Sequence, residues 1–296
     1  MKIMITGANG YFGKQLARRL REEISGVEIV GVDVRHESDI HGEMKFRAGD
    51  TRKKRIEDLF KVEGKIDAVI HLAFESGLPE TTSDELMITN VYGTFHMLEL
   101  AEKYGVKTFI YPSSTIVYGA RPDNPAIVRE NHPLLGNRDI PPIRDRVEAD
   151  LICQTFARGG GLNCRVVILR FVPIWRSGGS GILTRYMQGS IVPTPLGFDP
   201  MFMTMFDNEV LDAFSIALKN PEAQGAYNIR GKTFAPISDV IRKLGKTALP
   251  LPEFLIHSHG RSLWANNVKF DYNYLKYTFA VDGARAKNEL GYDPVK

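Results

Sequence analysis

Three glycines near the start of the chain, spaced three apart, suit the binding of an anion. They follow a short apolar run at Ile3–Ile5 and lead into a helical pattern at Lys14–Glu23. Such glycines allow a sharp turn and close approach to a ligand, and the helix N-terminus adds unpaired N–H groups and its positive dipole end. The order predicts a dinucleotide pyrophosphate site, the alternative being a plain strand-to-helix turn. The predicted contacts are Gly7, Asn9, Gly10, Tyr11, Phe12 and Gly13.

An acidic residue, Asp33, follows the next apolar run at Glu28–Val32. A carboxylate at this place can accept hydrogen bonds from ribose hydroxyls, and its charge would repel a 2′-phosphate. This favours NAD over NADP as the cofactor. Arg35 lies two residues further on and could accommodate a phosphate, so NADP remains the alternative. Val34, between the two, is included among the predicted cofactor-binding residues.

Apolar runs and helical patterns alternate through the first part of the chain. The runs read as buried parallel strands because they lack polar alternation; they are Ile3–Ile5, Glu28–Val32, Ala68–Leu72, Thr108–Tyr111 and Arg165–Leu169. The helical patterns between them are Lys14–Glu23, Arg55–Glu63, Glu85–Tyr104 and Ile143–Arg158. This rhythm predicts an α/β fold, a Rossmann-type doubly wound parallel sheet with its ligands beyond the carboxyl ends of the strands.

The pattern loosens beyond Arg170, where glycine and proline become frequent. A helix at Asp207–Lys219, a strand at Ala226–Arg230 and a helix at Ile237–Leu244 follow. We therefore expect a dinucleotide-binding domain over residues 1–171, to which residues 202–232 return. Residues 172–201 and 233–296 are expected to form a smaller C-terminal substrate lobe.

Bulk properties exclude several classes of protein. A net charge of +3 over 296 residues makes no case for nucleic acid as a partner. The most apolar stretch, Val166–Trp175, is short and contains Arg170, so it cannot span a membrane. Cys153 and Cys164 lack metal-ligand spacing, and the first strand begins too near Met1 to leave room for a signal peptide. We expect a cytoplasmic protein with no bound metal.

Several segments carry a resemblance to a known family. They are the glycine loop, Asp33, Gly49-Asp50, His71-Leu72-Ala73, Asn90-Val91-Tyr92-Gly93-Thr94, Ser113-Ser114-Thr115-Ile116-Val117-Tyr118-Gly119, Asp282-Gly283-Ala284-Arg285-Ala286 and Glu289-Leu290-Gly291-Tyr292-Asp293-Pro294. In this order they resemble the extended short-chain dehydrogenase/reductase family, the NAD-dependent nucleotide-sugar epimerases and dehydratases. The resemblance implies a small-molecule substrate such as a nucleotide sugar. It also implies a homodimer, formed by packing Glu85–Tyr104 and Ile143–Arg158 into a four-helix bundle.

The resemblance also extends the cofactor site. Asp50 matches the residue that reaches the adenine, with a simple helix cap as the alternative. Leu72, Ala73 and Phe74 would line the cofactor, although Leu72 could equally belong to the core. Asn90 resembles the asparagine that braces the central strands. The other implied cofactor contacts are Thr51, Pro112, Ser113, Arg146 and Phe171.

The catalytic segment departs from the family pattern. Relatives use a Ser or Thr, matched here by Ser114, and a Tyr-x-x-x-Lys pair whose spacing puts both side chains on one helix face. In the corresponding helix the tyrosine position holds Pro142 and the lysine position holds Arg146, and no tyrosine occurs from Gly119 to Leu169. Proline has no hydroxyl to accept a proton, but it suits the first turn of a helix. Arg146 could still bind the ribose.

Two hypotheses remain open at this point. The first is an enzyme with a non-standard acid–base group, for which Tyr118, Glu75 and His132 are candidates. The second is a catalytically inactive NAD-binding sensor or assembly subunit. Within the substrate lobe, several residues are candidates for gripping a pyrophosphate or lining its pocket: Trp175, Arg176, Arg185, Tyr186, Arg261 and Trp264.

Overall fold

The computed structural model describes residues 1–34, 42, 44–75, 81–159, 164–175, 182–256 and 271–294. Its main element is a seven-stranded parallel sheet with the strand order β3-β2-β1-β4-β5-β6-β9. The strands are β1 (Lys2–Thr6), β2 (Glu28–Asp33), β3 (Lys45–Ala48), β4 (Ala68–His71), β5 (Thr108–Ser114), β6 (Arg165–Phe171) and β9 (Gly225–Ile229). The Rossmann-type doubly wound fold predicted from the sequence is confirmed.

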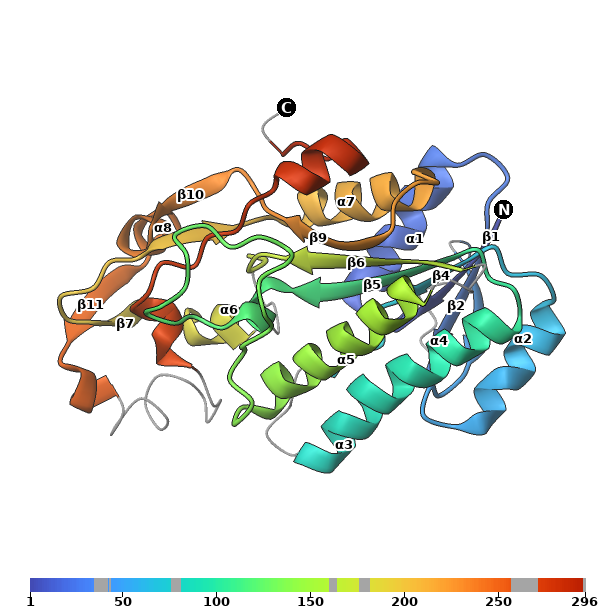
Figure 1. Cartoon of the computed structure of the whole chain (residues 1–296), viewed down its shortest axis with the longest axis horizontal. Coiled ribbons are helices and arrows are strands. Elements are labelled where there is room, and N and C mark those ends of the chain that lie inside the picture. Colours follow the sequence, from blue (N-terminus) through green and yellow to red (C-terminus); the bar gives the residue numbers. More distant parts are fainter. Residues whose placement is uncertain are drawn as a thin grey trace.

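Helices cover both faces of this sheet (Figure 1). On one face lie α1 (Tyr11–Glu23) and α7 (Asp207–Lys219), which contact each other. On the other face lie α2 (Glu57–Glu63), α3 (Ser83–Met87), α4 (Gly93–Lys103) and α5 (Pro141–Arg158). A π-helical turn, η3 (Ile88–Tyr92), joins α3 to α4. Short 3-10 turns, η2 (Lys54–Ile56) and η4 (Thr115–Tyr118), precede α2 and follow β5.

The apolar strands are explained by burial on both sides of the sheet. Ile3 and Ile5 of β1 face the cluster that contains Leu16 of α1, whereas Met4 faces the opposite cluster with Leu98 of α4. All five side chains are at most 1% exposed. A strand that buries both faces needs an apolar residue at every position, which is why the sequence shows runs without alternation.

Two small sheets lie beyond the carboxyl ends of the main strands (Figure 1). One pairs β8 (Met201–Thr204) with β10 (Thr233–Pro236), and the other pairs β7 (Ile191–Pro195) with β11 (Thr247–Leu251). These four strands were not predicted. The helices α6 (Ile182–Tyr186) and α8 (Ile237–Lys243) belong to the same region, and 3-10 and π-helical turns η5 (Tyr272–Leu275) and η6 (Ala286–Leu290) lie near the C-terminus. The division into two domains remains a prediction.

A buried ionic network ties α5 to the centre of the sheet. Arg170 of β6 donates from Nε and Nη2 to the two carboxylate oxygens of Asp150, at 3.0 and 2.7 Å, and both side chains are fully buried. Ser113 at the end of β5 donates to the same carboxylate. Arg170 also donates to the hydroxyl of Tyr118, which donates in turn to Asn228 at 2.7 Å. These contacts fix α5 against the carboxyl ends of β5 and β6.

Candidate functional site

The glycine loop has the geometry that a dinucleotide needs. Gly7 adopts a φ of +67°, and a Cβ there would lie 2.7 Å from the carbonyl carbon of Leu72. A Cβ on Gly13 would lie 2.6 Å from the carbonyl oxygen of Ala8. Helix α1 begins at Tyr11 with Gly10 at its N-cap, so no side chain caps its first N–H groups. Phe12 packs against the core, and the hydroxyl of Tyr11 donates to Asp207.

The acid predicted to hold the ribose lies beside this loop. The Asp33 carboxylate accepts a hydrogen bond from the backbone N–H of Asn9 at 3.0 Å, which fixes it next to the glycine turn. Val34 follows at the end of β2 and is 58% exposed. Arg35, the residue that kept NADP open as an alternative, lies outside the described residues. The loop and Asp33 together fit a dinucleotide with free ribose hydroxyls.

The loop that follows β4 is held against the glycine turn. Leu72 and Ala73 donate their backbone N–H groups to the carbonyl and the hydroxyl of Thr6, at 3.1 and 3.3 Å. The Thr6 hydroxyl shares a hydrogen bond with Nδ1 of His71, whose Nε2 shares one with Thr94. Burial lowers the pKa of His71 to about 3, so the imidazole is neutral. It therefore acts as a fixed polar brace beneath the loop.

Asp50 and Thr51 lie just after the end of β3, and both form hydrogen bonds with nearby residues. The Asp50 carboxylate accepts from the backbone N–H of Arg52 at 2.9 Å and from its guanidinium at 2.8–3.1 Å. Those bonds lower the pKa of Asp50. Thr51 is buried, and its carbonyl accepts from Nδ1 of His96. The observed contacts of Asp50 are those of a turn cap, and its reach to an adenine remains a prediction.

Ser114 lies at the carboxyl end of β5, where the family pattern places the hydroxyl-positioning residue. Its Oγ donates to the carbonyl of Phe171 at 3.3 Å and accepts from the backbone N–H of Ile116. Tyr118 lies one turn further and is fully buried, and that burial raises the pKa of its phenol to about 12. Its hydroxyl already serves the Arg170 network. A proton acceptor needs a lower pKa and contact with substrate, so these facts favour a structural role for Tyr118.

His132 contacts Tyr118 and lines a surface cavity. Its ring packs edge-on against Tyr118, with centroids 6.0 Å apart. It lines a surface cavity of about 420 Å³ together with Arg129 and Asp282, which form an ion pair at 3.2 Å. These contacts link His132 to Tyr118 and to the cavity lining.

Helix α5 carries Pro142 and Arg146, the residues expected from the family resemblance at the positions of the catalytic pair. The helix begins at Pro141, so Pro142 lies in its first turn, as the sequence predicts. Arg146 lies one turn later and donates from Nη1 to the carbonyl of Pro112 at 2.6 Å. Its guanidinium carbon lies 3.3 Å from the ring centroid of Phe74, which is cation–π stacking distance. Arg146 is thus fixed between β5 and the loop after β4.

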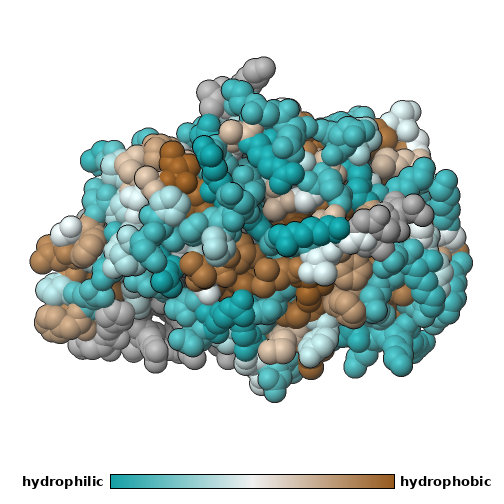
Figure 2. Space-filling view, viewed as in Figure 1, coloured by the Kyte–Doolittle hydropathy of each residue, from teal (hydrophilic) through white to brown (hydrophobic). Residues whose placement is uncertain are grey.

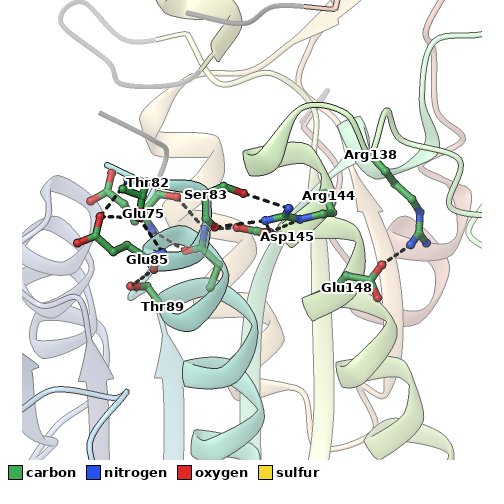
Figure 3. A network of polar contacts seen from close by, with 10 residues as sticks. Glu75, Thr82, Ser83, Glu85, Thr89, Arg138, Arg144, Asp145 and Glu148 are labelled. Atoms are coloured by element: carbon green, nitrogen blue, oxygen red, sulfur yellow. Dashed lines mark hydrogen bonds and ion pairs between the residues drawn. The ribbon is translucent and has the colours of Figure 1, made fainter. Parts of the chain in front are cut away.

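A polar network joins that loop to α5 (Figure 3). The backbone N–H of Glu75 donates to Oδ1 of Asn90 at 2.8 Å, and Nδ2 of Asn90 donates to the Glu75 carbonyl at 2.9 Å. The same Nδ2 lies 3.4 Å from Oδ2 of Asp145. Arg144 donates from Nε and Nη2 to the other oxygen of that carboxylate. It also reaches Ser83 at the start of α3.

Asp145 is the site residue that sequence reasoning missed. Its side chain is fully buried, and burial raises its pKa despite the ion pair with Arg144. A signal was present in the sequence. Asp145 shares helical spacing with Ala149, Ile152 and Phe156, which pack into the apolar cluster between the sheet and α4. A carboxylate on such a stripe needs a specific partner.

The fold and the glycine loop define a dinucleotide-binding protein of the Rossmann type. A sequence profile described as the NAD dependent epimerase/dehydratase family matches residues 3–173, more than half of the chain. The chain belongs to this family. The predicted resemblance is confirmed, and the family's dependence on NAD agrees with the cofactor predicted from Asp33.

Relatives cover most of the chain. An uncharacterized protein of Mycobacterium tuberculosis is 26% identical over 305 residues, covering 99% of this chain and 80% of its own length. A UDP-glucose 4-epimerase of Bacillus subtilis is 33% identical over 146 residues, covering 45% of this chain and 42% of its own. Among solved structures, a UDP-glucuronic acid 4-epimerase of Bacillus cereus in complex with NAD has a TM-score of 0.74 at 20% identity. It matches over 99% of this chain and 93% of its own.

Some predicted residues are not placed by the structure. Arg176, Arg261 and Trp264 of the substrate lobe lie outside the described residues, as does Arg35. Within the described part of the chain, no three His, Cys, Asp or Glu side chains form a group that could hold a metal ion. No described helix is long and apolar enough to cross a membrane.

Proposed function

We propose that this protein is an NAD-dependent enzyme of the epimerase, dehydratase or reductase type that acts on a nucleotide sugar or a related hydroxyl or keto compound. One observation carries the proposal. The glycine loop, Ser114, Arg146 and the loop after β4 gather at the carboxyl ends of adjacent strands, where such sheets bind their ligands.

Different residues would bind different parts of the cofactor. The glycine loop and the N-terminus of α1 would hold the pyrophosphate, and Asp33 would accept hydrogen bonds from the adenosine ribose. Arg146 keeps spare N–H donors after its bond to Pro112 and would bind the nicotinamide ribose. Bound NAD supplies an acceptor for the hydride that leaves the substrate's carbinol carbon.

We infer that Glu75 is the proton acceptor, in place of the tyrosine phenol of the family pattern. Ser114 would orient the substrate hydroxyl, and the Glu75 carboxylate would accept its proton while the carbinol C–H electrons leave as hydride and the carbon becomes a carbonyl. Burial lowers the pKa of Arg185 on α6, and the Glu75 charge opposes that effect, so Glu75 lies within electrostatic reach of the substrate lobe. The buried contacts of Tyr118 support Glu75 over the other candidates.

The test supplies the protein and NAD with a panel of UDP- and dTDP-sugars. Absorbance measures any reduced nicotinamide, and product analysis measures any product. We expect Glu75→Gln to lower kcat by about 10²- to 10⁴-fold, the usual contribution of a general base. Tyr118→Phe keeps the ring but removes the buried hydrogen bonds, so it should lower stability while leaving the pH profile unchanged. Absence of both reduced nicotinamide and product with every substrate, although NAD binds, would overturn the enzymatic proposal.

A second candidate function is a catalytically inactive NAD-binding sensor or assembly subunit. The observation that favours it is the pair at α5, where Pro142 offers no hydroxyl and Arg146 is already bound to Pro112 and Phe74. Such a protein would bind NAD tightly and change its association with a partner without consuming substrate. The substrate panel above separates the two functions.

We also propose that two chains pair through α4 and α5. Apolar side chains lie exposed along this face, and Figure 2 shows brown surface over these helices among charged residues. They are Ile88 and Tyr92 of the adjoining turn η3, Phe95 of α4 and Leu151 of α5, each between 37% and 59% exposed. Packing this face against its copy would give the four-helix bundle expected from the family. We also propose that the protein is cytoplasmic, as expected from its two cysteines.

A further inference from the structure

The connection between α5 and Glu75 runs through two fully buried side chains. Asn90 and Asp145 are each inaccessible to solvent, and they meet at 3.4 Å between Nδ2 and Oδ2. Asn90 in turn holds both backbone polar groups of Glu75. Removing a carboxylate from water is costly unless its partners compensate, so a buried acid at the start of a helix calls for an explanation beyond packing.

The Asp145 carboxylate fixes which way the Asn90 amide points. An amide has an oxygen that only accepts and a nitrogen that only donates, whereas an ionised carboxylate only accepts. Asp145 therefore favours the orientation in which Nδ2 faces it. In that orientation Oδ1 of Asn90 lies where it accepts from the N–H of Glu75. A flipped amide would set two oxygens against each other and would place its NH₂ group against the Glu75 N–H.

A second contact joins the same two elements. Arg146, the residue after Asp145, stacks on Phe74, the residue before Glu75. Arg144, on the other side of Asp145, reaches Ser83 at the start of α3. Three consecutive residues of α5 thus make contacts around the loop after β4, and Figure 3 shows those of Arg144 and Asp145. The loop cannot shift relative to Ser114 and Arg146 without breaking at least one of these contacts.

We propose that Asp145 is a positioning residue, which acts through the Asn90 amide to hold Glu75 at the place where the family's helix would present its tyrosine. This inference rests on the proposed function, because it assumes that Glu75 is the acid–base group. It extends that function by assigning a role to a residue that touches neither substrate nor cofactor. The helix that lost its phenol then still determines where the proton acceptor lies.

The charges around the two carboxylates set the direction of the pH effect. Asp145 faces Arg144 and Glu148 from its own helix and the neutral Asn90 from η3, while Arg185 of α6 acts on Glu75. Replacing Asp145 by Asn removes a negative charge and frees the positive charge of Arg144. Both changes make the electrostatic potential around the loop after β4 more positive. The acid limb of the kcat profile should therefore move to lower pH.

The test compares Asp145→Asn with Glu148→Gln, a matched loss of one carboxylate charge on the same helix. Glu148 pairs with Arg138 at the surface, apart from the Asn90 network (Figure 3). For Asp145→Asn we expect faster amide hydrogen exchange in residues 72–75, a kcat lower by about tenfold to 10²-fold with an unchanged KM, and the shifted acid limb. Glu148→Gln should match the wild type in all three measurements.

Unchanged exchange and unchanged kcat in a folded Asp145→Asn protein would overturn the positioning role. If Asp145→Asn does not fold, Arg144→Gln tests the same clamp. Its side chain is 23% exposed, and its loss should also speed exchange in residues 72–75. Failure of the proposed function gives a different pattern. The wild type would then show no turnover, or Glu75→Gln would keep its rate, while the exchange measurement would still test the clamp.

Discussion

In the proposed function, residue 142 limits where a proton can go. With proline in the first turn of α5, the helix has no group there that could accept a proton, and Arg146 one turn later is too basic to serve. Proton transfer must then use a group from another element. In the proposed function that group is Glu75, the residue after Phe74, whose backbone N–H and carbonyl both bond to Asn90. The chemistry would be relocated by one element.

Restoring the family pair should relieve the dependence on Glu75. We expect Pro142→Tyr with Arg146→Lys to recover product formation when added to an inactive Glu75→Gln protein, because it supplies a phenol and a lysine at four-residue spacing. Product analysis by chromatography measures the recovery, and Arg146→Lys alone is the control. If the double change creates activity in a wild-type protein that has none, the sensor function is favoured instead.

Adding a methyl group at Gly13 should weaken NAD binding, whereas adding one at Gly26 should not. Gly13→Ala would place a Cβ 2.6 Å from the Ala8 carbonyl oxygen and force the glycine loop to move. Overpacking of this kind costs about 1–3 kcal/mol, so we expect the Kd for NAD to rise by about tenfold or more. Calorimetric titration with NAD measures it. Gly26→Ala is the control, since Gly26 has a φ of +69° in an exposed turn with open space around it, and NAD affinity should be unchanged.

At the scale of elements, the Glu23 carboxylate helps to join α1 to α7. Glu23 at the end of α1 accepts hydrogen bonds from Arg19 and from Ser215 and Lys219 of α7. Burial alone would raise the pKa of Glu23, but these bonds outweigh it and lower the pKa to about 2. The folded protein therefore favours the ionised form more strongly than the unfolded chain does.

This linkage predicts a pH-dependent difference in stability. Because the folded pKa is depressed, the contribution of Glu23 is complete above about pH 4.5 and declines as the pH falls toward 2. Glu23→Gln should lower the free energy of unfolding by about 1 kcal/mol at pH 7. In urea titrations the gap from wild type should narrow below pH 4.5. A gap that stays constant down to pH 3 would contradict the assignment.

The sequence predicted the elements whose burial leaves a clear pattern of apolar residues. Each of the six predicted strands lies in the main sheet, because strands buried on both faces need uninterrupted apolar runs. Three of the four strands in the small sheets contain proline, which is disfavoured in strand interiors, at Pro193, Pro195, Pro236 and Pro250. The fourth strand, β8, has only four residues. The helix expected over Glu85–Tyr104 contains the π turn η3, which carries Asn90. Its partners, Glu75 and Asp145, are distant in sequence, and local patterns do not encode such pairings.

At the scale of the whole molecule, the exposed face of α4 and α5 predicts the oligomeric state. We expect light scattering at micromolar concentration to give twice the mass of one chain. Tyr92→Lys with Leu151→Lys should give a monomer, since lysines facing their copies across the interface repel and lose apolar burial. Val62→Lys is the control, because Val62 is 70% exposed on α2, outside that face. A monomeric wild type would contradict the predicted bundle.

The π turn at Ile88–Tyr92 also has a consequence for how the chain tolerates changes in length. A π turn accommodates one more residue than an α turn, so η3 is the place where this helix can lose a residue and still continue. Deleting Thr89 would let α3 run into α4 as ordinary α-helix, with both flanking faces kept in register. Asn90 would rotate away from Glu75 and Asp145. Deleting one residue would therefore break the contacts of Asn90 with the loop and leave the surface expected to pair two chains unchanged. A point substitution at Asn90 would also break those contacts, but it would leave the π turn in place.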